Sequence, residues 1–237
     1  MAVQEHDVRD LAIELLHSMK RFYKFRELES ILGISTPTLW RYIHGEIKPS
    51  PERAREIINR LLSPPVLEEV KRKIVSVRDG IVNVYPLAYS IDVLTIAAID
   101  AYLWARDLGP SVVLTTEVDG IPLATLIAKK LGVSLLVAKR RREVGYSHFL
   151  ETSYLAYDPP EVRTIYLPKE VLPPNERVLI VDDLVRSGRT TRALIDIVRQ
   201  ARSIVVGFYA LIGYGPTWRS ALKSLVGDRY RVLFEVQ

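Results

Sequence analysis

The sequence contains no cysteine, so disulfide bonds, thiolate zinc sites and cysteine nucleophiles are all excluded. It also lacks any uncharged apolar run near the ~18 residues of a membrane-spanning helix. Its first ten residues are acidic and polar, unlike a signal peptide. We therefore expect a cytoplasmic protein without a membrane segment. Asparagine and glutamine are scarce and arginine outnumbers lysine, which favours a heat-adapted (thermophilic) source.

A basic tail is also missing. The formal net charge is +5, but residues 1–65 hold ten basic and nine acidic side chains, so the excess is spread along the chain. A concentrated basic segment would have indicated nucleic acid by itself. Charge alone therefore does not indicate DNA binding, which has to be recognised from a local motif.

The first 62 residues have the pattern of a small helical domain. Apolar residues recur at helical spacing from Val8 to Leu16, and again across residues 25–32 and 52–62. Gly33 is suited to ending a helix, and Ser35 to starting the next one. We place the limit of this domain at residue 63, before Pro64 and Pro65.

The rest of the chain alternates short apolar strands with helices. We expect helices at 92–108 (amphipathic), 121–131 and 190–202, strands at 112–116, 134–138, 178–181 and 204–212, and a hairpin around 158–160. This order indicates an α/β fold with a mostly parallel sheet covered on both faces, of Rossmann-like type. The predicted domains are thus residues 1–63, a connector at 64–84, and residues 85–237.

The most specific motif spans residues 178–191. A buried strand ends in Asp182 and Asp183, and a short loop with hydroxyls and Gly188 then opens a helix. Free amides at a helix N-terminus bind anions, and neighbouring carboxylates accept hydrogen bonds from a sugar diol. The motif therefore favours a ribose phosphate ligand, with both acids at a solvent-facing strand end. The plain alternative is a strand followed by an acid-capped helix without special function.

This segment resembles the phosphoribosyl pyrophosphate (PRPP) signature of the type I phosphoribosyltransferases. The resemblance covers about residues 85–215 and implies that Asp182 and Asp183 hold the ribose hydroxyls as the catalytic acid pair. It assigns the 5′-phosphate to the residues of the following loop, which are Arg186, Ser187, Gly188, Arg189, Thr190 and Thr191. It also implies Mg²⁺, carried by PRPP rather than by direct protein ligands.

Two further segments match the order of that family. Residues 115–124 resemble its pyrophosphate-binding loop, which often carries a non-proline cis peptide, and the basic run at 139–142 precedes an expected mobile loop at 142–148. A solvated charge run is the alternative for the second segment. The resemblance assigns the pyrophosphate to Glu117, Val118, Asp119, Gly120, Lys139 and Arg140, and Tyr214 and Trp218 are candidates to stack on a nucleobase.

Residues 25–49 resemble the helix-turn-helix of the Cro and phage-repressor family. By that resemblance the second helix enters the major groove of double-stranded DNA, with Arg41 as the main base contact and Lys48 on phosphate. The full set of expected DNA contacts is Thr36, Pro37, Trp40, Arg41, His44 and Lys48. The alternative is a small helical hood or dimerisation module.

The two motifs together resemble archaeal and bacterial phosphoribosyltransferase-like transcription regulators. The leading hypothesis is accordingly a homodimeric regulator that binds a palindromic DNA site and senses PRPP or a related nucleotide. The second hypothesis is an active purine or orotate phosphoribosyltransferase with an accessory N-terminal domain, and a protein with both activities is a third. Whether the chain is an enzyme is thus left open by the sequence.

Overall fold

The computed structural model of the chain describes residues 3–78, 81–83, 85–157 and 160–236. Contacts divide the chain into two compact units, Glu5–Asp100 and the combination of Met1–Gln4 with Ala101–Gln237. Residues 1–2 and 237 lie outside the described residues. So do parts of two predicted features: positions 79, 80 and 84 of the connector, and Asp158 and Pro159 of the hairpin turn.

The unit Glu5–Asp100, called the helical unit below, begins with helices whose ends carry capping residues. The Asp7 carboxylate accepts the Arg9 amide at the start of the first helix, and the Ser50 hydroxyl accepts the Arg53 amide in the same way. Gly33 ends the second helix with a φ of 65°. The helices are α1 Val8–Met19, α2 Phe25–Leu32, α3 Thr36–Ile43, α4 Pro51–Leu61 and α5 Pro64–Ile74.

The expected connector at 64–84 differs from the observed structure over its first half. Pro64 and Pro65 lie in the first turn of α5, where a proline loses no helical hydrogen bond. Val66 and Val70 are buried, and the Tyr23 hydroxyl donates to the Val66 carbonyl at 2.9 Å. This segment therefore packs as part of the helical unit. Short elements follow it: β1 Val77–Arg78, β2 Ile81–Val82 and α6 Tyr85–Ala88.

Helix α7, Ile91–Ala105, continues into a 3-10 turn, η1 Arg106–Leu108. Its position agrees with the predicted helix at 92–108, but it is buried on nearly all sides rather than amphipathic. The reason lies in its composition, because Asp100 is the one charged side chain between residues 93 and 105.

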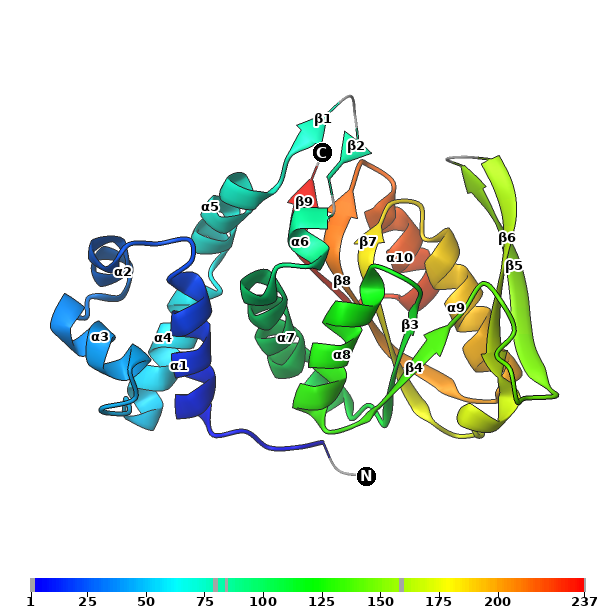
Figure 1. Cartoon of the computed structure of the whole chain (residues 1–237), viewed down its shortest axis with the longest axis horizontal. Coiled ribbons are helices and arrows are strands. Elements are labelled where there is room, and N and C mark those ends of the chain that lie inside the picture. The colour runs from blue at the N-terminus through cyan, green and yellow to red at the C-terminus, as the bar shows by residue number, and fades with distance from the viewer. Residues whose placement is uncertain (1–2, 79–80, 84, 158–159, 237) are drawn as a thin grey trace. The chain divides into compact units, whose positions relative to one another are not determined.

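The second unit is built on a sheet of five parallel strands in the order β4-β3-β7-β8-β9 (Figure 1). Strands β5 and β6 form a separate antiparallel hairpin, in which Phe149 pairs with Pro168 at the end far from the turn. The predicted α/β class with a mostly parallel sheet is therefore confirmed. The strands are β3 Val112–Thr116, β4 Ser134–Ala138, β5 Phe149–Tyr157, β6 Pro160–Pro168, β7 Arg177–Val185, β8 Ile204–Tyr214 and β9 Tyr230–Val236.

Helices cover both faces of this sheet. Alternate residues of a strand point to opposite faces, and Leu114, Ile180 and Phe208 share one buried cluster with side chains of the helices after β7 and β8. On the other face the Trp104 ring of α7 packs 6.3 Å from that of Tyr209. The remaining elements are α8 Gly120–Leu131, η2 Lys169–Val171, α9 Arg189–Gln200 and α10 Trp218–Val226.

Two elements at the C-terminal end were not expected from the sequence, α10 and β9. Gln4 also belongs to this unit, because its amide donates to the Leu131 carbonyl and the Tyr102 hydroxyl donates to its carbonyl. Among the helices of the described residues, none combines the length and apolar character that crossing a membrane requires.

Candidate functional site

The site is set by the point at which the strand order changes direction. From β3 the chain adds β4 on one side, and it then adds β7, β8 and β9 on the other. Strand β7 pairs with β3 only as far as Leu114↔Ile180, so its carboxyl half is free of that neighbour. In open parallel sheets, ligands bind in the crevice outside the strand ends at such a switch point.

The acid pair lies in this free half of β7. The strand extends to Val185 rather than ending at residue 181, and Asp182 pairs with Ala210 of β8. Asp182 is only 5% exposed, which corrects the expectation of a solvent-facing side chain, whereas Asp183 is half-buried. The Asp183 amide donates to Asp182 Oδ1 at 3.1 Å.

Both carboxyl groups have raised pKa values. Burial, followed by the nearby charge of Asp183, holds the pKa of Asp182 well above its ordinary value. Burial also raises the pKa of Asp183, with a smaller contribution from the charge of Asp119. The pair therefore favours ligands that bring hydroxyl donors or positive charge to it.

The loop after β7 leads into a helix without a side-chain cap. Gly188 precedes α9 with a φ of 70°, and as a glycine at the N-cap position it supplies no side-chain hydrogen bond to the first amides of the helix. The Thr191 hydroxyl is buried in the first turn without a hydrogen-bond partner among the described residues. Arg189 donates instead to the Leu155 carbonyl of the hairpin at 2.7 Å. Ser187 is exposed and Thr190 is half-buried. Uncapped first-turn amides and a nearby unpaired hydroxyl form a polar setting suited to an anion.

The loop after β3 packs closely against the acid pair. A Cβ atom added to Gly120 would lie 2.6 Å from Thr115 Oγ1 and 3.7 Å from Asp182 Oδ1. The Glu117–Val118 peptide bond is cis, as the resemblance led us to expect. Val118 is exposed, and Asp119 occupies the N-cap position of α8. The N-terminus of α8 is thus brought directly beside β7.

The basic run after β4 lines a cavity of about 400 Å³. Glu117 joins this wall, where its Oε1 accepts the Arg140 amide at 2.7 Å. Lys139 forms an ion pair with Glu143, and Arg142 bonds to Glu151. The cavity is lined by Glu117, Lys139, Arg140, Arg141, Arg142, Glu143 and Val144.

The two aromatic candidates for the nucleobase have different surroundings. Tyr214 is half-buried at the end of β8, with the Arg186 guanidinium 5.4 Å from its ring centre. Trp218 is only 3% exposed and meets the Tyr230 ring edge-on at 6.2 Å. A Cβ on Gly213 would lie 2.5 Å from the Trp218 ring. Trp218 is therefore a core side chain rather than an open stacking surface, and Tyr214 is the candidate that remains.

The expected DNA contacts lie on or beside α3 in the helical unit. Leu39 and Tyr42 are buried, while Pro37, Trp40 and Arg41 are exposed. The Trp40 ring, 42% exposed, stacks on His44 at 3.9 Å.

Acidic side chains lie close to several of these positions. The Glu29 carboxylate accepts from the Thr36 amide and hydroxyl at the start of α3, and Arg41 pairs with Glu46 at 3.3 Å. Lys48 likewise pairs with Asp10 at 2.6 Å.

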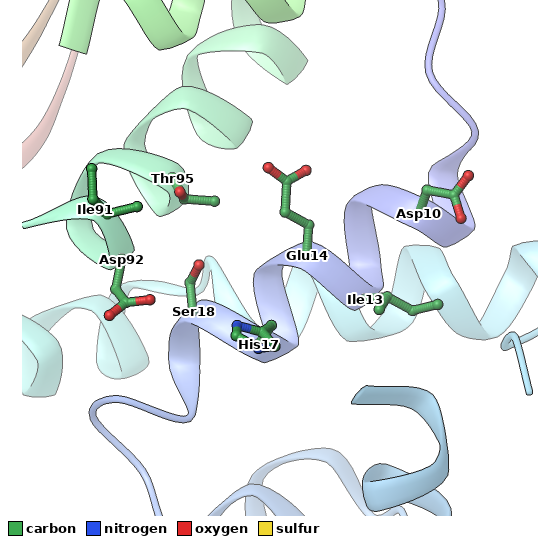
Figure 2. Close-up of a pocket in the computed structure, with 8 residues that line it drawn as sticks. All are labelled: Asp10, Ile13, Glu14, His17, Ser18, Ile91, Asp92 and Thr95. Carbon is green, nitrogen blue, oxygen red and sulfur yellow. The ribbon is translucent and has the colours of Figure 1, made fainter. Parts of the chain in front are cut away.

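A second cavity, of about 420 Å³, lies between α1 and the start of α7 in the helical unit. Figure 2 shows Glu14 of α1 and Thr95 of α7 projecting toward the space between these helices. Three carboxylates line it, those of Asp10, Glu14 and Asp92.

Within the described residues, no group of three or more His, Asp or Glu side chains is arranged to hold a metal ion. The buried acid pair and the basic cavity instead fit a cation that arrives with an anionic ligand, since two adjacent carboxylates with raised pKa values favour added positive charge. The donor set thus fits Mg²⁺ carried by a polyphosphate.

Sequence reasoning assigned no role of their own to two side chains of this site. Thr115 is fully buried against Gly120, and Glu143 faces Lys139 in the basic cavity. The four-residue spacing of Glu143 from Lys139 was the available signal for the second, since opposite charges so spaced often pair. Thr115 begins the segment 115–124 that the resemblance identified, but its contact with Gly120 depends on the turn between them, which the sequence does not display.

The acid pair, the uncapped helix and the two flanking loops thus lie together at the carboxyl end of the sheet. Known proteins that match this chain define its class. The family model of the phosphoribosyl transferase domain matches residues 92–226, and the chain belongs to this family. The chain is 30% identical over 155 residues to an adenine phosphoribosyltransferase of Ureaplasma parvum serovar 3, covering 63% of this chain and 88% of that protein.

Other relatives carry related names. A xanthine phosphoribosyltransferase of Geobacillus thermodenitrificans is 35% identical over 104 residues, which cover 44% of this chain and 54% of the relative. The match to the xanthine phosphoribosyltransferase of Stutzerimonas stutzeri covers 54% of this chain and 66% of that relative. The chain thus spans between about half and two thirds of these curated relatives.

A solved structure shares the fold. The adenine phosphoribosyltransferase of Thermoanaerobacter pseudethanolicus superposes with a TM-score of 0.62 at 21% identity, covering 71% of this chain and 99% of that one.

Proposed function

We propose that this chain is a purine phosphoribosyltransferase, which transfers the phosphoribosyl group of PRPP to a ring nitrogen of a purine base. The observation that carries the proposal is the close approach of Gly120, at the start of α8, to Asp182 at the switch point of the sheet, on the strand that leads into α9. The names of the relatives, xanthine and adenine phosphoribosyltransferases, support a purine over orotate.

The proposed binding mode follows from the chemistry of each group. Asp182 and Asp183 accept hydrogen bonds from the ribose hydroxyls, and the amides of the loop at 186–191 bind the 5′-phosphate. The loop at 117–120 and the basic residues Lys139, Arg140 and Arg141 receive the pyrophosphate. Mg²⁺, when bound with PRPP, neutralises the charge of this leaving group.

In the proposed reaction, a base nitrogen attacks C1′ of the ribose as the bond from C1′ to the pyrophosphate oxygen breaks. The electron pair of that bond leaves with pyrophosphate, and the proton of the attacking nitrogen passes to solvent. The chain contributes by orientation: it holds the diol at one end and the leaving group at the other, so that C1′ faces the base. Tyr214 is the proposed aromatic surface for the base.

The test is an assay of the full chain with PRPP, Mg²⁺ and one base at a time: xanthine, guanine, hypoxanthine, adenine or orotate. Pyrophosphate release together with the matching nucleotide is expected for a purine. The variant that carries both Asp182→Asn and Asp183→Asn is the control for the site. Lack of turnover with every base would contradict the enzymatic proposal.

We propose DNA binding as a separate function of the helical unit. It is supported by the packing of α3, which buries Leu39 and Tyr42 and exposes Trp40, Arg41 and His44 on one side. A homodimer would present two such helices to a palindromic site with half-sites about one helical turn apart. PRPP or a nucleotide would then act as effector.

The test is a gel-shift titration against the upstream DNA of the chain's own gene, with and without PRPP and Mg²⁺. A sequence-specific shift that changes with PRPP supports a regulator. A dimer that shows no sequence preference at moderate salt would contradict this second function and leave the enzymatic one untouched.

A further inference from the structure

The basic run after β4 starts from a rigid backbone. Lys139 exchanges two backbone hydrogen bonds with Tyr166 of β6, at 2.9 and 2.8 Å. The Arg140 amide is held by Glu117 at 2.7 Å. The loop then continues through residues 141–148 without helix or strand. The positions of Lys139 and Arg140 are therefore defined, whereas the residues that follow are not part of a regular element.

The cationic side chains of the run are not equally available to an anion. Arg142 bonds to Glu151 at 2.8 Å, and its guanidinium lies over the rings of Phe149 and Tyr166 at 5.5 and 5.3 Å. The ammonium of Lys139 donates to the carboxylate of Glu143 across the cavity. In the part of the chain that is described, Arg140 and Arg141 form no ion pair. Lys139, one of the two cations expected to bind pyrophosphate, is thus already paired with a carboxylate of the same chain.

We propose that Glu143 is an internal counter-ion that occupies Lys139 until the pyrophosphate group of the substrate displaces it. Glu143 thereby sets the affinity of the cavity for pyrophosphate. This inference rests on the proposed phosphoribosyltransferase function and adds to it a residue that determines binding strength.

The surroundings of Glu143 allow such an exchange. Its ion pair with Lys139 is half exposed on both sides, and exposed pairs of this kind contribute little free energy. Val144 is 93% exposed, and Gly145 follows with a φ of 96° and no neighbouring atom within 4 Å of a Cβ position. The chain after Glu143 therefore has room to move. Pyrophosphate carries several charged oxygens, so it can accept hydrogen bonds from Lys139 and from a neighbouring cation at once, which the Glu143 carboxylate does not do.

The experiment is calorimetric titration of the full chain with inorganic pyrophosphate and, separately, with PRPP, both with Mg²⁺. Glu143→Gln is expected to tighten pyrophosphate binding by about two- to tenfold, because it frees Lys139 and removes a repulsive charge. Glu161→Gln is the matched control, since it removes the same charge from a half-exposed carboxylate that is also paired with a cation, Arg163 on the hairpin. That variant is expected to bind as the unchanged protein does.

A double-variant cycle separates release of Lys139 from loss of repulsion alone. With Lys139→Gln present there is no ammonium to release, so adding Glu143→Gln should give a clearly smaller gain than in the unchanged background. Equal gains in both backgrounds, or no gain from Glu143→Gln, would overturn the inference while leaving the proposed function in place. Absence of any pyrophosphate or PRPP binding by the unchanged protein would overturn both.

Discussion

A methyl group placed on Gly120 would lie 3.7 Å from a carboxylate oxygen of Asp182, although 62 positions of sequence separate the two residues. This proximity brings the first turn of α8 against the carboxyl half of β7. It joins the loop after β3 and the acid pair into one site, and it leaves no space for a side chain at position 120.

Gly120→Ala tests this packing. Its Cβ would lie 2.6 Å from Thr115 Oγ1, so the turn must shift, and we expect a loss of about 1–3 kcal/mol in the free energy of unfolding. PRPP affinity should fall as well, because the shift moves the loop away from Asp182. Urea denaturation and calorimetric titration measure the two effects. Adding Thr115→Ala should recover much of the stability, and an absence of such recovery would show that the contact with Thr115 is not the cause.

Asp182→Asn tests the buried carboxyl through pH. A carboxyl with a raised folded pKa contributes stability that is fully present below its unfolded value, about 3.9, and is lost as the pH rises through the folded pKa. Asparagine cannot lose a proton, so the stability of the variant relative to the unchanged protein should increase as the pH rises from about 3.9 through the folded pKa.

The measurement is thermal denaturation of both proteins at a series of pH values that starts near the ordinary pKa of an aspartate, about 3.9, and continues above neutral pH. The same Asp182→Asn variant should lose PRPP binding, and with Asp183→Asn added it should bind none. A stability difference that stays constant across this pH range, or retained PRPP affinity in the folded double variant, would contradict the assignment.

Trp218→Ala and Tyr214→Ala separate a core role from a ligand role. Trp218 is buried against Gly213 and Tyr230, so its truncation should cost about 3–5 kcal/mol of unfolding free energy. Tyr214→Ala should cost much less stability and raise the KM for the purine instead. Urea denaturation and steady-state kinetics with varied base give both quantities. A small stability effect at Trp218 would restore it as a stacking candidate.

Tyr23→Phe tests the attachment of α5 to the helical unit. The Tyr23 hydroxyl donates to the Val66 carbonyl, and burial raises the pKa of Tyr23 to about 12. Its contribution to stability is present below the ordinary pKa near 10 and is lost as the pH rises through about 12. Phenylalanine should cost about 0.5–1.5 kcal/mol at neutral pH.

Denaturation monitored by helical circular dichroism measures that cost, and an ultraviolet titration of the tyrosines checks the raised pKa. A Tyr23 that titrates near 10 in the folded protein would contradict the buried hydrogen bond.

Arg41→Ala tests the DNA-binding proposal. It should weaken specific binding by about 1–3 kcal/mol without changing PRPP affinity. Lys48→Ala is the companion variant: it should weaken binding to all sequences alike and reduce the salt dependence. Gel shifts at two salt concentrations with specific and unrelated DNA distinguish the two effects. An unchanged specific shift would remove Arg41 from the contact surface.

Local pattern was sufficient for much of the fold. The predicted strands at 112–116 and 134–138 agree with β3 and β4, and the predicted caps Gly33 and Ser35 mark helix limits in the structure. These features depend on the side-chain periodicity and backbone preferences of neighbouring residues, which a sequence displays directly. The acid pair followed by the glycine loop belongs to the same class, because all its parts lie within 14 consecutive residues.

Tertiary packing decided the rest. The two prolines that suggest a linker in fact begin α5. Proline is compatible both with a linker and with the first turn of a helix, and the burial of Val66 favours the helix. Trp218 became a core residue because Gly213 lets the ring approach the strand. The burial of Asp182 arises from strand pairing and from the approach of α8, which involve residues far apart in the chain. The sequence by itself therefore determined the elements and the chemistry of the loops, whereas long-range contacts determined which side chains face a ligand.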